Sequence, residues 1–106
     1  MKFMSLKELD WKELLPGYRA CFVHSETMTV AHWKIAPGAS MPGHSHPHEQ
    51  VSNIIDGQFE LTIEGVTKIL GPDDVAIIPP NASHSGKALT KCRIIDAFYP
   101  IREDYR

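Results

Sequence analysis

Residues 38–50, GASMPGHSHPHEQ, hold three of the six histidines of the chain, all within positions 44–48. Histidines clustered this closely indicate metal binding before any other role. Side chains along an extended chain alternate between two faces, so the even positions His44, His46 and Gln50 are predicted to point to one side. We therefore expect these three residues to bind one metal ion inside a barrel.

A further ligand has to come from another part of the chain. His84 is the predicted donor, because it follows the tight turn at 79–81 at the start of another strand. His48 also has even parity, but Pro47 is expected to distort the chain beside it, which favours a supporting or surface role. For Gln50 the alternative is a hydrogen bond to a metal-bound water. His24 and His32 are interpreted as structural or surface residues.

Short runs of β-favouring residues, separated by turns rich in Gly, Pro, Asn and Asp, recur after residue 17. The predicted strands are Tyr18–His24, Thr27–Ile35, Gln50–Ile55, Gln58–Glu64, Val66–Leu70, Val75–Ile78, Ser83–Lys87 and Lys91–Phe98. Eight short strands at this spacing predict an all-β sandwich or closed barrel.

The N-terminal residues differ from the rest. Ser5 and Glu8 have the spacing of a helix capping box, which predicts a short helix from Ser5 to Leu15, with an irregular or extended arm as the alternative. A chain of 106 residues has room for one domain. We expect that domain to consist of an N-terminal arm or helix (1–17) and a β-barrel (18–106).

Composition narrows the possible partners and the compartment. The net charge is −2, from 13 acidic and 11 basic residues, and no basic run is present, so nucleic acid is not an expected partner. No apolar stretch is long enough to span a membrane. The first residues lack the apolar stretch of a signal peptide, which predicts a cytoplasmic location. Cys21 and Cys92 are expected to be reduced and buried.

The spacing of the histidines resembles the two sequence motifs of the cupin family. The first motif, G-x5-H-x-H-x3-E-x6-G, is matched at every spacing by Gly38, His44, His46, Gln50 and Gly57. The second, G-x5-P-x-G-x2-H-x3-N, is matched by Pro79 and His84, while Asp73, Asn81 and Ala88 depart from it. Asn81 is a mild change, because Asn tolerates the left-handed backbone that Gly supplies. The resemblance implies a cupin jelly-roll barrel with one divalent metal ion.

Gln50 stands where the motif has Glu, and this changes the charge of the site. Four neutral ligands leave the full +2 charge on the ion. Such a site favours a stronger Lewis acid and disfavours a higher oxidation state. The predicted cofactor is one divalent transition metal ion, which could be Ni, Zn, Fe, Mn or Cu.

Two segments resemble the KdgF-type small cupins more closely: HSHPHEQV (44–51) and DAFYPIREDYR (96–106). That family carries Gln in the Glu position. It converts 4,5-unsaturated uronates, the monomers released by pectate and alginate lyases, to linear 5-keto-4-deoxyuronates. The resemblance implies a sugar-acid substrate, a homodimer, and functional roles for Asp96, Phe98 and Arg102.

These three residues suit that chemistry. A carboxyl group among apolar neighbours has a raised pKa, so Asp96 is the candidate general acid. Arg102 could clamp the substrate carboxylate through a two-pronged pair, and Phe98 could form a flat wall against the sugar ring. The structural alternatives are a salt bridge of Asp96 with Lys91 or Arg93, a core role for Phe98, and a solvated tail at 102–104.

The same residues leave two alternative functions open, and a homodimer is the expected oligomeric state. Another cupin metalloenzyme, a dioxygenase or isomerase, is one alternative, since one fold supports many chemistries. The other is a non-catalytic cupin that binds or senses a sugar through a metal ion. A homodimer is expected, with the arm Met1–Gly17 covering a strand edge of the partner.

Overall fold

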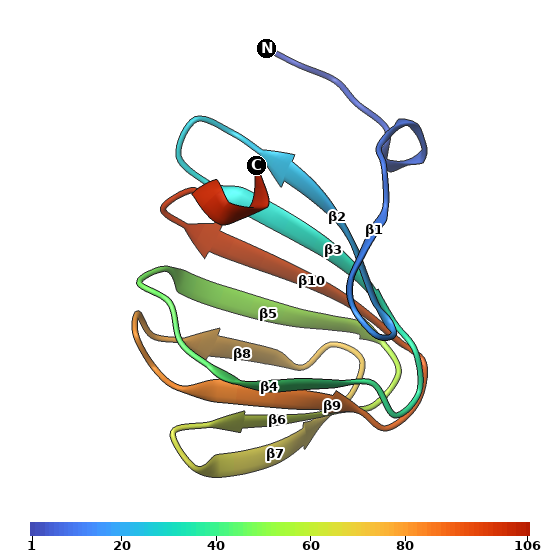
Figure 1. Cartoon of the computed structure of the whole chain (residues 1–106), viewed down its shortest axis with the longest axis vertical. Helices are drawn as coiled ribbons and strands as arrows, with labels where there is room; N and C mark the ends of the chain where they lie inside the picture. Colours follow the sequence, from blue (N-terminus) through green and yellow to red (C-terminus); the bar gives the residue numbers. More distant parts are fainter.

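The computed structural model describes all 106 residues, and they form ten strands and two short 3₁₀ turns (Figure 1). The turns are η1 (Leu6–Glu8) and η2 (Glu103–Tyr105). The strands are β1 (Lys12–Leu15), β2 (Tyr18–His24), β3 (Thr29–Ile35), β4 (Ser40–His44), β5 (Glu49–Asp56), β6 (Phe59–Ile63), β7 (Val66–Leu70), β8 (Val75–Ile78), β9 (His84–Ala88) and β10 (Cys92–Tyr99).

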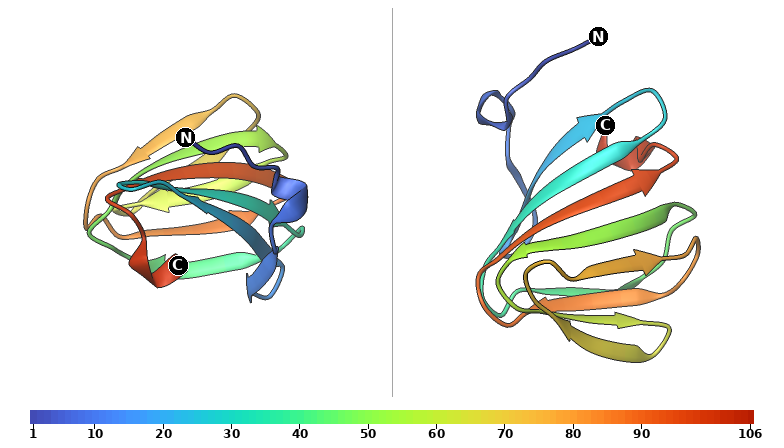
Figure 2. Two further views of the ribbon diagram at one scale, coloured as in Figure 1. Left: turned by 90° about the horizontal axis from the view of Figure 1, so that it is seen from above. Right: turned by 180° about the vertical axis from the view of Figure 1, so that it is seen from behind.

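The strands make two antiparallel sheets that face each other (Figures 1 and 2). One sheet has six strands in the order β1-β2-β3-β10-β5-β8, and the other has four in the order β4-β9-β6-β7. The predicted all-β jelly roll is therefore confirmed. No helical segment has the length and apolar character needed to cross a membrane.

The core fills the space between the sheets. β10 lies in the six-stranded sheet between β3 and β5, and its inward face carries Ile94, Asp96 and Phe98. β6 turns Phe59 and Leu61 inward from the other sheet, as its alternating sequence predicts. Each buried Ile, Leu or Phe stabilises the fold by roughly 1.5–3 kcal/mol. The face of β10 that builds the core thus also places one carboxyl group inside the protein.

All eight predicted strands are present, with ends shifted by no more than two residues. The predicted helix Ser5–Leu15 is wrong beyond its first turn. The Ser5 hydroxyl does accept a hydrogen bond from the Lys7 amide at 3.2 Å, but the 3₁₀ turn ends at Glu8. Residues from Lys12 onward pair with β2 instead, so strand pairing overrides a weak local helix signal. The alternative, an extended arm, describes this segment better.

Two turn residues that replace a motif glycine keep the backbone conformation that glycine favours, and Gly57 keeps the glycine itself. Asn81 has φ +66° and Asp73 has φ +72°, so both occupy the left-handed region that Asn and Asp tolerate better than most residues. Gly57 has φ +89°, and a Cβ there would collide with the carbonyl of Lys91. Cys21 and Cys92 are buried and do not form a disulfide, as predicted.

Candidate metal centre

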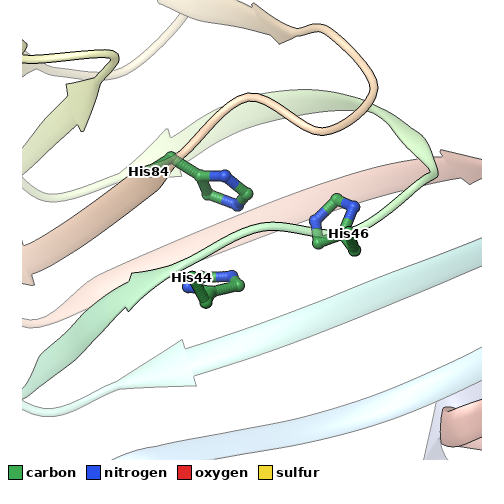
Figure 3. Close-up of side chains that lie close together, drawn as sticks. All are labelled: His44, His46 and His84. Carbon is green, nitrogen blue, oxygen red and sulfur yellow. The ribbon is translucent and has the colours of Figure 1, made fainter.

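Three histidines meet in the interior between the sheets (Figure 3). His44 is the last residue of β4 and His84 the first of β9, and the two positions are paired across the neighbouring strands. His46 lies in the loop from β4 to β5. The ligand nitrogens of the three side chains lie within 4.8 Å of one another, which is close enough for one ion to reach all three.

Each histidine ring is held by a backbone carbonyl through Nδ1. His44 Nδ1 is 2.9 Å from the Pro42 oxygen, His46 Nδ1 is 3.1 Å from the His48 oxygen, and His84 Nδ1 is 2.9 Å from the Ala82 oxygen. A carbonyl oxygen can only accept, so Nδ1 carries the proton and donates in all three rings. The lone pair of every ring therefore lies on Nε2, which is the tautomer that a metal ion requires.

The Nε2 atoms of His84 and His46 have no hydrogen-bond donor facing them, although an unprotonated ring nitrogen needs one when it is buried. His84 Nε2 is buried and has no hydrogen-bond partner. His46 Nε2 lies 3.0 Å from Gln50 Oε1, and with Nδ1 protonated both of these atoms are acceptors. Two ligand atoms that each lie about 2.1 Å from one ion at a right angle are about 3.0 Å apart. The residues present therefore fit a divalent metal ion.

Burial keeps these rings neutral. Burial, together with the positive charge of Arg102, lowers the pKa of His46 to about 4. Burial also lowers the pKa of His84, although the hydrogen bond with the Ala82 carbonyl opposes this shift. At neutral pH both rings thus have a free lone pair for a metal ion.

The route by which the chain brings the ligands together differs from the prediction. His44, His46 and Gln50 do not lie on one face of a continuous extended segment, because β4 ends at His44 and the chain turns through residues 45–48 into the other sheet. Gln50 is on β5, opposite Phe98 of β10. His48 stays outside the cluster and contributes its carbonyl to His46, which is a supporting role.

The pocket beside the histidines also contains Asp96, Phe98 and Arg102. It is lined by residues from both sheets and from the C-terminal turn: Tyr18, Trp33, Ile35, Met41, His44, His46, Gln50, Ser52, Phe59, Leu61, His84, Ser85, Gly86, Ile94, Asp96, Phe98, Arg102 and Tyr105. The structure therefore brings all the sequence-predicted site residues into one cavity.

Asp96 is buried in this pocket with one of its oxygens engaged. The indole N–H of Trp33 donates to Oδ2 at 3.0 Å, while Oδ1 has no partner. Burial raises the pKa of Asp96 to about 6, and the nearby polar side chains of Ser52, Trp33 and Gln50 oppose the shift. The salt bridge with Lys91 or Arg93 is absent. A buried carboxyl with a raised pKa suits a proton donor.

Phe98 and Arg102 form the wall next to His46. The Phe98 ring centroid is 5.6 Å from that of His46, and the Arg102 guanidinium lies 4.8 Å from the Phe98 centroid. Arg102 is buried, with 6% of its surface exposed, so it is not part of a solvated tail. The predicted pair of a positive group and a flat apolar wall is therefore present beside the histidines.

The C-terminal wall is anchored to β2 and β3 by a short hydrogen-bond relay. The backbone N–H of Arg102 donates to Thr29 Oγ1 at 2.9 Å, which leaves the Thr29 hydroxyl proton for His24 Nδ1 at 2.8 Å. His24 Nε2 then donates to the carbonyl oxygen of Tyr105 at 3.2 Å. The structural role predicted for His24 is thus supported.

Sequence reasoning missed several residues of the site. Ser52 could have been found, since it is two residues from Gln50 and must point to the same face of β5. Trp33 and Tyr105 carried no such signal, because their contacts join segments far apart in the chain or depend on the geometry of η2. Asp104 lies in the C-terminal segment that resembles KdgF-type cupins, but its pairing with Arg102 also depends on η2.

Metal loading is expected to stabilise the fold. A ligand that binds only the folded state adds about 2.7 kcal/mol when present at 100 times its Kd. For a domain of this size that corresponds to a rise in Tm of roughly 10–20 °C. The check is thermal unfolding after chelation and after adding Ni²⁺, Zn²⁺ or Mn²⁺. Mg²⁺, which prefers oxygen ligands, is the control, and an equal rise with Mg²⁺ would contradict a histidine site.

The raised pKa of Asp96 predicts a pH-dependent stability. An aspartate in an unfolded chain titrates near 3.9, whereas Asp96 in the folded chain titrates at about 6. The folded state binds more protons between these values, so the stability conferred by protonated Asp96 is lost as pH rises through 6. Two pKa units correspond to about 3 kcal/mol.

The measurement compares metal-free wild type with an Asp96→Asn variant by urea unfolding. On going from about pH 7 to about pH 4, the free energy of unfolding of the wild type should rise by up to about 3 kcal/mol relative to the variant. His46 titrates in the opposite sense, but both proteins contain it, so its effect cancels in the difference. A difference that does not change with pH would contradict the raised pKa.

Comparison with known proteins shows one matching family model and three similar proteins. A family model described as "Cupin domain" matches residues 31–98. The pectin degradation protein KdgF of Dickeya dadantii (strain 3937) is 32% identical in a match of 101 residues that covers 92% of this chain and 92% of that protein. The structure of KdgF from a Halomonas species superposes with a TM-score of 0.94 at 29% identity, covering 100% of this chain and 99% of that one. An RmlC-like cupin from Shewanella frigidimarina NCIMB 400 also gives 0.94, at 26% identity, covering 100% and 96%.

Proposed function

The chain belongs to the cupin family and resembles KdgF over nearly its whole length, and from this we propose that it linearises 4,5-unsaturated uronate monosaccharides to 5-keto-4-deoxyuronates in a metal-dependent reaction. The observation that carries the proposal is a single pocket that contains the three histidines, a buried carboxyl group at Asp96 and a buried guanidinium at Arg102. This combination offers a metal, a proton donor and a carboxylate-binding group to one small sugar acid.

The proposed metal ligands are the Nε2 atoms of His44, His46 and His84 together with Oε1 of Gln50. The unpartnered His84 Nε2 and the facing acceptors of His46 and Gln50 support this set. With all ligands neutral, a bound divalent transition ion supplies Lewis acidity to oxygen atoms of the sugar. The rest of the reaction can be assigned to residues of the chain.

Asp96 is the proposed proton donor. The substrate is an enol ether, with its double bond between C4 and C5 and the ring oxygen on C5. Asp96 transfers its proton to C4 while water adds to C5, and the proton released by that water returns to the carboxylate. The resulting hemiketal opens when the bond from C5 to the ring oxygen breaks: the proton of the C5 hydroxyl passes to the ring oxygen, which leaves a ketone at C5 and a hydrated aldehyde at C1. The unpartnered Oδ1 of Asp96 is the oxygen that can face the substrate, because Trp33 occupies Oδ2.

Arg102 and Phe98 are proposed to orient the sugar. The positive guanidinium attracts the substrate carboxylate, which is attached to C5 and therefore fixes the reacting end of the ring. The Phe98 ring contacts both Arg102 and His46 and offers a surface on which an apolar face of the sugar can rest. Together they hold C4 near the acid.

The direct experiment gives metal-loaded protein an unsaturated galacturonate and follows the loss of its conjugated ultraviolet absorbance. The expected result is acceleration over buffer that disappears on chelation and returns when metal is restored. A decay rate equal to that in buffer, with metal bound, would rule out this function.

We further propose that the protein is a homodimer in which the N-terminal arm of one copy contacts its partner. The arm extends away from the body of the fold (Figures 1 and 2) and exposes the apolar side chains of Met1, Phe3 and Met4. Exposed apolar side chains grouped on one segment favour contact with another surface. Light scattering should give twice the mass of the 11.9 kDa chain, and deletion of residues 1–9 should reduce it to one copy. A wild type that stays monomeric at micromolar concentration would contradict this assembly.

A further inference from the structure

The guanidinium of Arg102 is held by two neighbours to which no role has yet been given. Asp104 accepts two hydrogen bonds from it, Nε to Oδ1 at 2.9 Å and Nη2 to Oδ2 at 2.7 Å. The ring of Tyr105 lies 4.1 Å from the guanidinium carbon, and that of Phe98 lies 4.8 Å from it. A charged side chain is thus fixed in one orientation at the edge of the pocket.

The pairing with Asp104 uses only one edge of the guanidinium. An arginine has five N–H donors, and Asp104 takes the one on Nε and one on Nη2. The second edge, formed by Nη1 and the other N–H of Nη2, is not paired with a carboxylate of the protein. Two parallel N–H groups of this kind match the two oxygens of a carboxylate.

Arg102 and Asp104 lie in different surroundings. The side chain of Asp104 is 56% exposed and does not line the pocket, whereas that of Arg102 is only 8% exposed and does line it. With the Nε edge turned toward Asp104 at the surface, the Nη1 edge is left for a ligand in the pocket. Asp104 therefore does not occupy the edge that a ligand would use.

Building on the proposed function, we propose that Asp104 is a positioning residue that turns the Nη1/Nη2 edge of Arg102 into the pocket and so makes the site selective for a sugar carboxylate over a neutral sugar. An unrestrained arginine side chain has many rotamers, and fixing it in advance removes part of the entropy lost on binding. Tyr105 and Phe98 restrain the same group through their rings.

The first test is the kinetics of an Asp104→Asn variant on unsaturated galacturonate. We expect KM to rise about 10-fold with kcat changed by less than about two-fold, because the loss lies in preorganisation of the binding group and not in the acid. Asp104→Glu keeps the charge and should recover most of the affinity. Glu103→Gln is the matched control, since Glu103 is on the same turn and pairs with Arg106 instead of Arg102.

The sign of the effect separates positioning from competition. If Asp104 instead blocked the substrate, its neutralisation would lower KM. An unchanged or lower KM for Asp104→Asn, or an equal rise for Glu103→Gln, would overturn the proposal. Equal melting temperatures of the wild type, Asp104→Asn and Glu103→Gln would show that a folding defect does not cause the change in KM.

A second test needs no turnover. Titration calorimetry with galacturonate and with galactose, on metal-loaded protein, should show binding of the acid in preference to the neutral sugar by the wild type. Asp104→Asn should lose most of this preference. No preference in the wild type would overturn the carboxylate site even if the uronate is turned over. Preference without turnover would leave the inference standing and remove the proposed reaction.

Discussion

Replacement of His84 by alanine is expected to lower the affinity for a divalent transition metal ion by more than about 100-fold, since even residues that only support metal ligands contribute 10–100-fold. His84 points its unprotonated Nε2 into the cluster, and its Nδ1 makes only one hydrogen bond, to the Ala82 carbonyl. The fold should therefore survive the change. Metal content after dialysis and the metal-dependent rise in Tm both measure the loss, and uronate turnover should fall with them.

His32→Gln is the matched control for this prediction. His32 lies on the face of β3 opposite to that of Trp33, away from the pocket. The substitution therefore removes an imidazole without changing the histidine cluster. This variant should retain wild-type metal content. Full metal occupancy in His84→Ala, or an equal loss in His32→Gln, would contradict the assigned ligand.

Replacement of Asp96 by asparagine is expected to slow uronate linearisation by about 10²–10⁴-fold, the usual contribution of a positioned general acid. Asparagine keeps the shape of the side chain and can still accept from the Trp33 indole, but it has no acidic proton to transfer. Metal content should stay at the wild-type level, because Asp96 is not among the proposed ligands. The decay of ultraviolet absorbance at saturating substrate measures the effect on kcat.

Asp56→Asn tests whether the loss is specific to position 96. Asp56 is the exposed last residue of β5, next to the same strand β10, and lies outside the pocket lining. Its replacement should leave the rate unchanged. If Asp96→Asn retained a rate within about two-fold of wild type, the acid would have to be another group, even with the overall reaction intact.

Most of the fold could be predicted because its signals are local. Alternation in residues 58–64, turn residues such as Asn81, and the spacing of the histidines each depend on a few neighbouring positions. The two strands that were missed show where local signals end. β1 is held by pairing with β2 although it carries a helix-like pattern, and β4 contains Pro42 and Gly43, which argue against a strand.

The residues of the candidate site likewise include some that local patterns predicted and others that only the folded structure reveals. Motif spacing predicted the histidines and Gln50, and resemblance predicted Asp96, Phe98 and Arg102. Trp33 is 63 residues from Asp96 in sequence, and no pattern within β3 indicates that its indole donates to that carboxyl. Asp104 reads as a surface acid in a charged tail, and only the backbone course of η2 shows which edge of Arg102 it occupies.

The ligands of the candidate centre belong to both sheets, His44 and His84 to the four-stranded sheet and Gln50 to the six-stranded one. An ion bound by all of these residues would cross-link the two sheets. Any collective motion that separates the two sheets would move His84 away from Gln50. Separation of the sheets and dissociation of the ion would therefore occur together. The lifetime of the bound metal would then be set by how often the barrel opens, and less by how fast a single ligand exchanges with water.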